Sequence, residues 1–373
     1  MTFLIHLIAC SGKSESNDLY YDTANSDTSD TISDSDTTDT YDTNSSSNYS
    51  HAIVTTADYA NGLGALAVIG LETQTVNDNL IQNIHSDALT VVEESLIFQI
   101  NRLGVDSIRI YEWANWNAPL TEWSTGDNSN PQQVAKCFDT VVTSLFAKDY
   151  LAIYNLNGII QGQIDLSAFV PAGDTDGSPE ASSIIRIGNS AYVALQQLDM
   201  DGGGPSVQST GPGMVLEVDC ESLSVLNTFE VGPNPRLSAV GNNIIMRTGI
   251  LGNFDGGIRR LDTQSNELAA YTIYDLDYGV WFSGIAGTTD GQIGVNGFDP
   301  VTYESVFLCG DDNGLVEIER SSSSYFSHII NNDQSEFWLS TDQGIRIFDS
   351  ESCSELTETP IQTTLNPSHV SFY

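Results

Sequence analysis

The sequence predicts an all-β protein, a seven-bladed β-propeller preceded by a disordered tether. Residues 183–231 give the clearest sign, because they contain four short apolar runs, each bounded by Gly, Asn, Asp or Ser. That pattern indicates a four-stranded antiparallel meander. A single meander leaves an apolar face and a strand edge uncovered, and repeating it around a circle covers both.

Units that align with this meander recur along the chain from residue 51 to residue 373. Dividing that span by seven gives about 46 residues per unit, which is typical of propeller blades. Complete units are expected at 88–123, 132–166, 183–231, 236–274, 284–318 and 327–361.

The two ends of the repeat region together predict the seventh blade. Three strands are expected at 51–56, 65–69 and 76–81, and one at 367–373, which would lie innermost and close the ring. The alternatives are a β-sandwich, two smaller barrels, or a propeller of six or eight blades, because regularly spaced short strands suit all of these.

The charge of the chain limits its partners. With 12 Lys and Arg against 50 Asp and Glu, the formal net charge is −38. Such a surface repels phosphate backbones and anionic headgroups, so we expect no nucleic acid among its partners. The excess acid serves either solubility or the binding of divalent cations. We expect a monomer.

The N-terminus contains an apolar run, FLIHLIAC at residues 3–10, that ends in a cysteine. It is far shorter than the about 20 apolar residues that cross a bilayer, and it fits the end of a secretory signal. Leu7-Ile8-Ala9-Cys10 resembles the bacterial lipobox, which implies lipidation of Cys10, although no Lys or Arg precedes the run. The expected organisation is a signal peptide at 1–10, a disordered acidic Ser/Thr/Asp linker at 11–50 and the propeller at 51–373.

Several stretches carry a family resemblance. SLIFQINRLGVDSIRIYE, SAYVALQQLD and GPGMVLEVDCESLSVLNTFEVG resemble the YncE-like seven-bladed propeller lipoproteins of Gram-negative bacteria. The resemblance covers most of residues 85–277. It implies an exported lipoprotein anchored to the outer membrane, on its periplasmic or cell-surface side.

The long loops between strands two and three and between successive blades are expected on one face of the propeller. Long loops on a rigid scaffold are where function usually lies. This face would bring aromatic walls and polar groups together into a small-molecule site. The predicted ligand-binding residues are Arg102, Phe254, Asp255, Asp275, Asp277, Tyr278, Trp281, Phe298 and Tyr303. Alternatively, the aromatic side chains pack the loops against one another.

Two short motifs share the D-x-D-G start of oxygen-ligand loops. They predict a Ca²⁺ site made of carboxylates, unless the motif has arisen by chance in an Asp-rich chain. The candidate ligands are Asp174, Asp176, Glu180, Asp199 and Asp201.

The cysteines and histidines carry no recognisable site pattern. Cys137, Cys220, Cys309 and Cys353 allow three pairings, and we expect zero or one disulfide. No nucleophile elbow, P-loop or HExxH motif is present, so an enzyme is not predicted. His328 and His369 fit structural histidines of strands near the inner or closing positions.

The leading hypothesis is therefore a non-enzymatic lipoprotein. Its propeller would bind a small molecule, such as a metal chelate or a corrinoid, without catalysing a reaction, and an outer-membrane transporter would be a partner. The alternatives are a protein-interaction scaffold in the cell envelope, or a propeller hydrolase or lyase.

Overall fold

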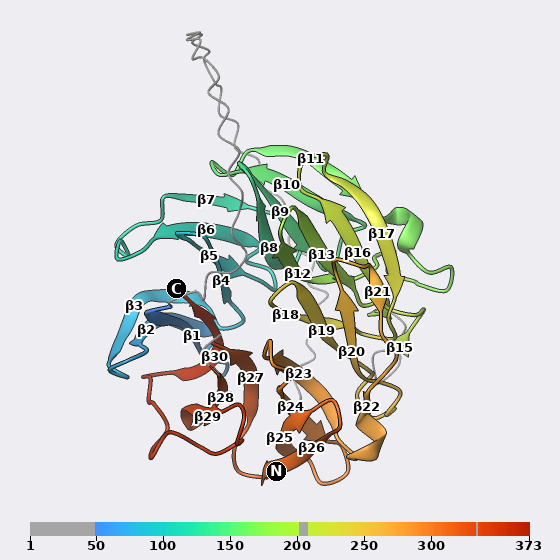
Figure 1. Cartoon of the computed structure of the whole chain (residues 1–373). Coiled ribbons are helices and arrows are strands. Elements are labelled where there is room, and N and C mark those ends of the chain that lie inside the picture. The colour runs from blue at the N-terminus through green and yellow to red at the C-terminus, as the bar shows by residue number, and fades with distance from the viewer. Residues whose placement is uncertain (1–48, 201–207, 333–334) are drawn as a thin grey trace. The chain divides into compact units, whose positions relative to one another are not determined.

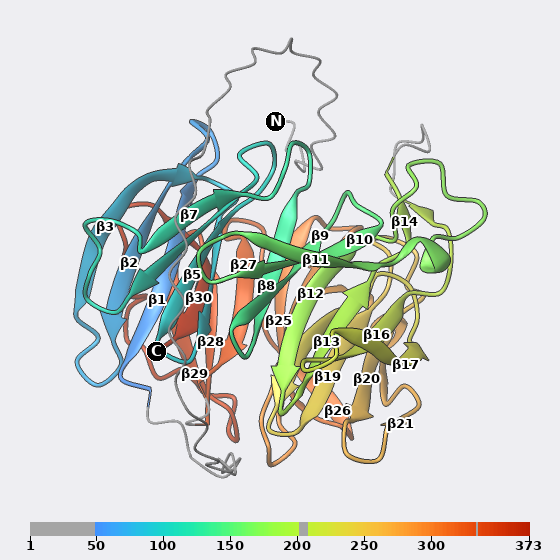
Figure 2. The ribbon, with the colours of Figure 1, turned by 90° about the horizontal axis from the view of Figure 1, so that it is seen from above.

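A computed structural model describes residues 49–200, 208–332 and 335–373. In this part of the chain, strands form seven sheets arranged around a central axis, and the prediction of a seven-bladed propeller is confirmed (Figures 1 and 2). Helical structure in the same ranges is limited to two 3₁₀ turns, η1 (Ser167–Phe169) and η2 (Asp275–Asp277). None of the helices described is long and apolar enough to cross a membrane.

The first four blades each contain four strands. The first blade comprises β1 (His51–Asp58), β2 (Leu63–Gly70), β3 (Val76–His85) and β30 (Asn366–Phe372). The second comprises β4 (Leu89–Glu93), β5 (Leu96–Asn101), β6 (Ser107–Glu112) and β7 (Thr121–Ser124). The third comprises β8 (Pro131–Cys137), β9 (Thr140–Leu145), β10 (Tyr150–Asn155) and β11 (Ile160–Asp165). The fourth comprises β12 (Ala181–Ile187), β13 (Ser190–Leu195), β16 (Met214–Asp219) and β17 (Ser224–Glu230).

The sixth blade follows the same plan, whereas the fifth and seventh depart from it in their outer strands. The fifth comprises β18 (Arg236–Val240), β19 (Asn243–Thr248), β20 (Gly257–Asp262) and two short outer strands, β21 (Glu267–Leu268) and β22 (Ile273–Tyr274). The sixth comprises β23 (Trp281–Gly287), β24 (Ile293–Asp299), β25 (Glu304–Asp311) and β26 (Gly314–Ser321). The seventh comprises β27 (Phe326–Asn331), β28 (Glu336–Thr341) and β29 (Gly344–Asp349). A separate hairpin pairs β14 (Leu198–Asp199) with β15 (Gln208–Ser209).

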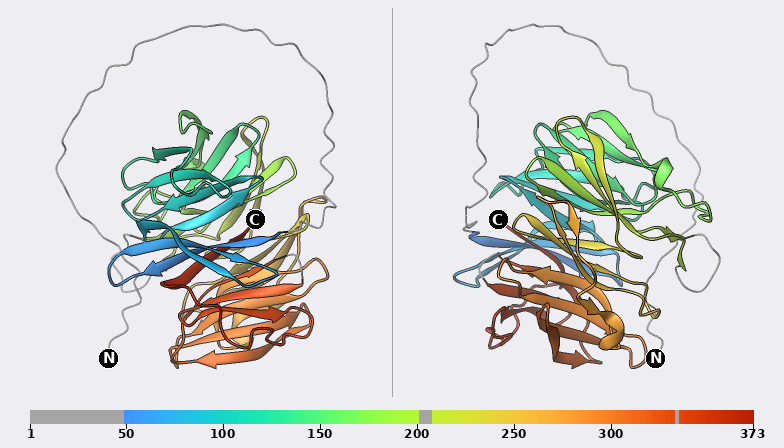
Figure 3. Two further views of the ribbon diagram at one scale, coloured as in Figure 1. Left: turned by 90° about the vertical axis from the view of Figure 1, so that its left-hand side faces the viewer. Right: turned by 45° about the vertical axis from the view of Figure 1, so that its right-hand side comes forward.

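The ring closes in the first blade, as the sequence predicts. β30 pairs with β1 in antiparallel register, with Val370 opposite Val54, so the two ends of the described chain lie side by side (Figures 1 and 3). The Tyr373 carbonyl accepts hydrogen bonds from the backbone N–H groups of Ser50 and His51. The Trp113 ring stacks on the Tyr373 ring at 4.5 Å, which gives this tryptophan the role of covering the closure.

Apolar side chains fill the spaces between blades. Seven clusters of buried residues are present in the described chain, and each joins two neighbouring sheets. In one of them, for example, Ala52 and Val370 of the first blade pack with Trp338 of the seventh. Each sheet is therefore apolar on both faces, which explains the near-continuous apolar runs in the inner strands.

Two expectations need correction. Residues 356–361 were expected to form the outer strand of the seventh blade, but they contribute only an isolated bridge between Ile345 and Ile361. Pro360 lies in this segment and has no N–H to donate to a sheet, so a regular ladder is disfavoured there.

The expectation of zero or one disulfide is also wrong. Cys137 pairs with Cys220, and Cys309 pairs with Cys353. The first bridge joins the third blade to the fourth, and the second joins the sixth to the seventh. Both link adjacent blades, which the spacing of the cysteines in the sequence does not reveal.

The disulfides are expected to stabilise the ring because they restrict the unfolded chain. The double substitution Cys137→Ala and Cys220→Ala should lower the free energy of unfolding by about 2–5 kcal/mol. Urea denaturation of the oxidised protein measures this loss. With excess reductant, the wild-type protein and the double variant should have similar stability. A difference between them that is the same with and without reductant would contradict the assignment.

Candidate functional site

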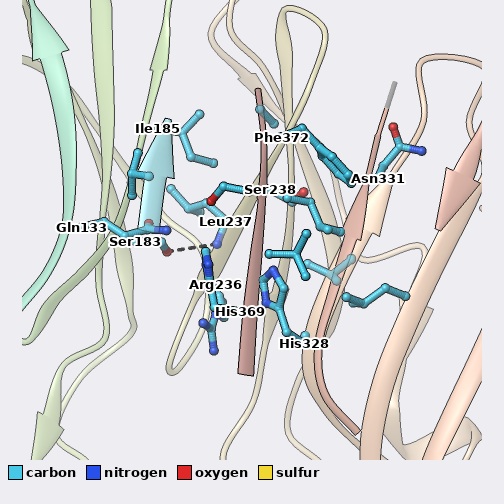
Figure 4. Close-up of a pocket in the computed structure, with 18 of the residues that line it drawn as sticks. Gln133, Ser183, Ile185, Arg236, Leu237, Ser238, His328, Asn331, His369 and Phe372 are labelled. Carbon is cyan, nitrogen blue, oxygen red and sulfur yellow. Dashed lines mark hydrogen bonds between the residues drawn. The ribbon is translucent and has the colours of Figure 1, made fainter. Parts of the chain in front are cut away.

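The inner strands of the seven blades surround a cavity on the propeller axis. Its volume is about 850 Å³, and residues of β4, β8, β12, β18, β23, β27 and β30 line it (Figure 4). Cavities of this size accommodate small molecules. We call the end where these strands begin, near Arg102 and Arg236, the upper mouth, and the end near Phe372 and Asn331 the lower mouth.

The upper mouth contains two arginines in very different surroundings. Arg102 follows β5, and its guanidinium donates to Asp87 Oδ1 at 2.6 Å, to the Asp87 carbonyl at 2.9 Å and to Gln132 Oε1 at 2.6 Å. Its charge is compensated by the Asp87 carboxylate, and its position is fixed by three contacts.

Arg236, the first residue of β18, has no such partner. Within the described residues no carboxylate forms an ion pair with Arg236, and no side-chain hydrogen bond to it is present. The side chain is exposed to the channel, yet the surrounding protein removes enough water to lower its pKa, and the charge of Arg102 adds to that effect. An uncompensated cation in partly dehydrated surroundings favours an anionic ligand.

Arg247 on β19 adds to the positive charge beside Arg236. It is 3% exposed, donates to the Asn234 carbonyl at 2.7 Å and lies over the Trp281 ring at 5.4 Å. Burial, and then the charge of Arg236, lower its pKa to about 9. Its Nε is buried without a hydrogen-bond partner in the described structure. Two guanidinium groups therefore lie on this side of the channel without a paired carboxylate.

Two histidines lie below the arginines. His328 of β27 stacks on His369 of β30 with ring centroids 4.3 Å apart, and both point into the cavity (Figure 4). Nε2 of His328 and Nδ1 of His369 are buried and lack a hydrogen-bond partner among the described residues. Burial, and then Arg236, lower the pKa of His328 to about 3, and burial with the neighbouring His328 lowers that of His369 well below its usual value. Both rings are neutral at pH 7.

Two tyrosines from loops stand at the upper mouth. Tyr59 follows β1 and Tyr325 precedes β27, and each exposes more than half of its surface. The walls of the mouth nevertheless enclose both hydroxyls enough that burial raises the pKa of each, with Asp87 contributing to the shift of Tyr59 and Arg236 opposing that of Tyr325. These aromatic residues could not be separated from other loop tyrosines in the sequence.

Of the predicted ligand-binding residues, Arg102 alone lines the cavity. The others lie in loops of the fifth and sixth blades, and several are engaged within the protein. Trp281 Nε1 donates to the Gly249 carbonyl at 2.9 Å, and the Tyr278 hydroxyl accepts from the Leu315 N–H at 2.8 Å. Phe298 and Tyr303 pack edge to face at 6.1 Å.

The predicted carboxylates of the same loops also have internal partners. Asp255 Oδ1 accepts from the Ile250 N–H at 2.9 Å, and Asp275 Oδ1 accepts from the Gly256 N–H at 3.3 Å. Asp275 is fully buried, and burial raises its pKa to about 6. Asp277 is exposed in η2, and Phe254 is half-buried with a φ of 51°. These contacts hold the loops together.

Three of the predicted metal ligands come together between the third and fourth blades. Carboxylate oxygens of Asp174, Asp176 and Glu180 all lie within 4.8 Å of one another. Glu180 is fully buried, and burial raises its pKa to about 9. Asp199 Oδ1 accepts from the Thr175 hydroxyl at 2.8 Å beside this group. Asp201 and Cys10 lie outside the described residues.

Comparison with known proteins shows the fold. No family model matches the chain, and no curated protein is similar to it in sequence. The periplasmic gluconolactonase of Pseudomonas aeruginosa is similar in structure, with a TM-score of 0.60 and 12% identity over 86% of this chain and 98% of that one. A candidate 6-phosphogluconolactonase of Bacteroides fragilis gives a TM-score of 0.58 and 12% identity, over 87% and 97% of the two chains.

A third similar structure serves as a contrast. The Swd1 propeller domain of Myceliophteria thermophila gives a TM-score of 0.52 and 10% identity, over 80% of this chain and 97% of that one. Proteins with such different names share this architecture, so the comparisons establish a β-propeller and leave its function to the site.

The neutral histidines predict a dependence of stability on pH. The unfolded chain takes up protons at both residues as the pH falls below about 6.5, whereas in the folded protein the pKa of His328 is about 3 and that of His369 is also lowered, so stability should decline as the pH falls below 6.5. His328→Asn should flatten the decline. Urea denaturation between pH 8 and pH 5 measures it, with Ser183→Ala as a control from the same channel. An unchanged slope in His328→Asn would contradict the assignment.

Proposed function

We propose that this protein is an exported propeller that binds an anionic small molecule at the upper mouth of its central channel. The observation that carries the proposal is Arg236, a cation without a partner among the described residues, in a chain with a net charge of −38. A protein so rich in carboxylates has many candidates to pair with an arginine, and none does so here. A bound anion would supply the missing partner.

The surrounding groups support this assignment. Arg102 lies on the opposite side of the mouth and donates to Asp87 and Gln132. Its charge is already paired, so it offers a ligand a polar contact at a fixed position. Tyr59 and Tyr325 add hydroxyl groups and aromatic surface at the rim. Metal chelates with carboxylate ligands have the required charge, and a corrinoid would rest over the mouth. We propose binding rather than catalysis.

We further propose that the protein is a YncE-like lipoprotein anchored through Cys10 to the outer membrane. The lipobox-like sequence and the disulfides support export, because disulfides persist in oxidising compartments. The described chain begins at Tyr49, which lines the cavity and packs on Phe372 at the lower mouth. A tether from Cys10 would therefore join the propeller at the end opposite to Arg236.

A protein-interaction scaffold is the second candidate. Loops at the upper-mouth end expose Leu103, Val105, Val301 and Tyr303, and exposed apolar side chains on one face favour a protein partner. Such a partner would contact the loops of the second and sixth blades and would not require Arg236.

The anion-binding proposal predicts a specific loss of affinity. Titration calorimetry of the purified full-length chain with the anions citrate and ferric citrate, and with cyanocobalamin as a corrinoid that is neutral overall, should show saturable binding of at least one of the two anions. Arg236→Gln should weaken that binding at least about tenfold, because a charge-assisted contact is lost. The matched control is Arg109→Gln, because Arg109 lies on β6 and already pairs with Glu122 of β7. Equal affinities for the two variants would overturn the proposal.

A Ca²⁺ site at Asp174, Asp176 and Glu180 is a separate proposal. Bound Ca²⁺ would require ionised Glu180 and would stabilise the folded state, so the melting temperature should rise with Ca²⁺ concentration. Asp176→Asn should abolish the rise, whereas Asp139→Asn, at another loop carboxylate, should leave it intact. A melting temperature that does not respond to Ca²⁺ would rule the site out.

A further inference from the structure

The side chains that face the channel change in character along its axis. Alternate residues of a strand lie on the same face of its sheet, and pairs two apart on several inner strands line the cavity at two levels. On β4 these are Thr90 and Val92, on β12 Ser183 and Ile185, and on β27 His328 and Ile330. On each of the three strands the upper member is polar and the lower member is aliphatic.

Val92, Ile185 and Ile330 therefore form an apolar belt below the histidine pair. All three line the cavity and remain partly exposed to it. In Figure 4, Ile185 lies toward one end of the pocket together with Phe372, whereas Arg236, His328 and His369 lie toward the other. Apolar side chains left exposed to an internal channel gain free energy when an apolar group covers them.

The lower mouth is polar again. Thr288, Asp290 and Asn331 line the cavity there, and the Thr288 hydroxyl donates to the Asp290 carboxylate. Arg236 at the upper mouth has no paired carboxylate among the described residues, whereas Lys136 and Arg186 near the lower ends of β8 and β12 both pair with Glu94. An anionic group is therefore attracted to the upper end.

The histidines extend the apolar surface upward. Neutral imidazoles stacked at 4.3 Å present flat rings to the cavity between the arginine and the belt. An apolar body attached to an anionic group would pass these rings before it reaches Ile185 and Ile330. A polyhydroxylated ligand would instead place its hydroxyls against aliphatic side chains, which leaves them without hydrogen-bond partners.

From this order of charged, aromatic and aliphatic side chains along the channel, we propose that the ligand is an amphipathic organic carboxylate. Its carboxylate contacts Arg236, and its apolar chain or ring extends down the channel past His328 and His369 to the belt of Val92, Ile185 and Ile330. This inference rests on the proposed anion site and defines the class of anion that the site accepts.

A series of carboxylates tests the inference in the purified full-length chain. Titration calorimetry with butanoate, hexanoate and octanoate should show affinity rising by roughly fourfold for each added methylene that reaches the belt. Gluconate has the same number of carbons as hexanoate but carries hydroxyls, and it should bind more weakly. Gluconate binding as tightly as hexanoate would overturn the inference while leaving the anion site in place.

Variants separate the belt from the anion site. Ile185→Thr and Ile330→Thr should remove most of the gain from chain length without abolishing the binding of butanoate, and Ile185→Val should retain it. Val316→Thr and Leu226→Thr, at exposed positions of outer strands, are matched controls. A gain that persists unchanged in Ile185→Thr and Ile330→Thr, with both variants folded by circular dichroism, would also overturn the inference. Failure of every carboxylate to bind would overturn the proposed function itself.

Discussion

The pairing of β30 with β1 is the constraint on which the channel depends. Without β30, the first blade would lack its inner strand, and β27 and β4 would lose the element that separates them. Ser371 of β30 donates to the Thr90 carbonyl at 2.7 Å, and His369 of the same strand completes the stack with His328. One strand therefore closes the ring, joins two neighbouring blades and supplies a wall of the cavity. The aromatic contact between Trp113 and Tyr373 covers the end of this strand.

The regular alternation of apolar runs and turn residues made it possible to predict the fold from the sequence. Apolar runs of regular length separated by turn residues placed the blades from residue 88 to residue 318, together with the closing strand near His369. An outer strand was wrongly predicted for the last blade because the segment has apolar residues at both ends, although the proline within it disfavours a regular ladder. The disulfides could not be paired, because Cys137 and Cys220 are brought together by the arrangement of neighbouring blades rather than by local sequence.

The site was harder to predict than the fold. Reasoning from long loops found Arg102 but otherwise favoured residues of the fifth and sixth blades, such as Tyr278 and Trp281, whose polar atoms bond to nearby backbone. Arg236 begins a strand in an ordinary turn context and gives no local signal. The role proposed for it rests on two global facts, the scarcity of cations in the chain and its position on an inner strand. A search for rare charges at inner-strand positions would have found it.

The position of β30 also has a consequence for how the molecule is made. Ala52 pairs with Phe372, so the sheet of β1 is complete only when β30 has been made. Contacts this distant in sequence are slow to form, because a long loop must close first. The first blade thus cannot be completed until β30 has been synthesised, and β1 keeps an open edge until that strand pairs with it.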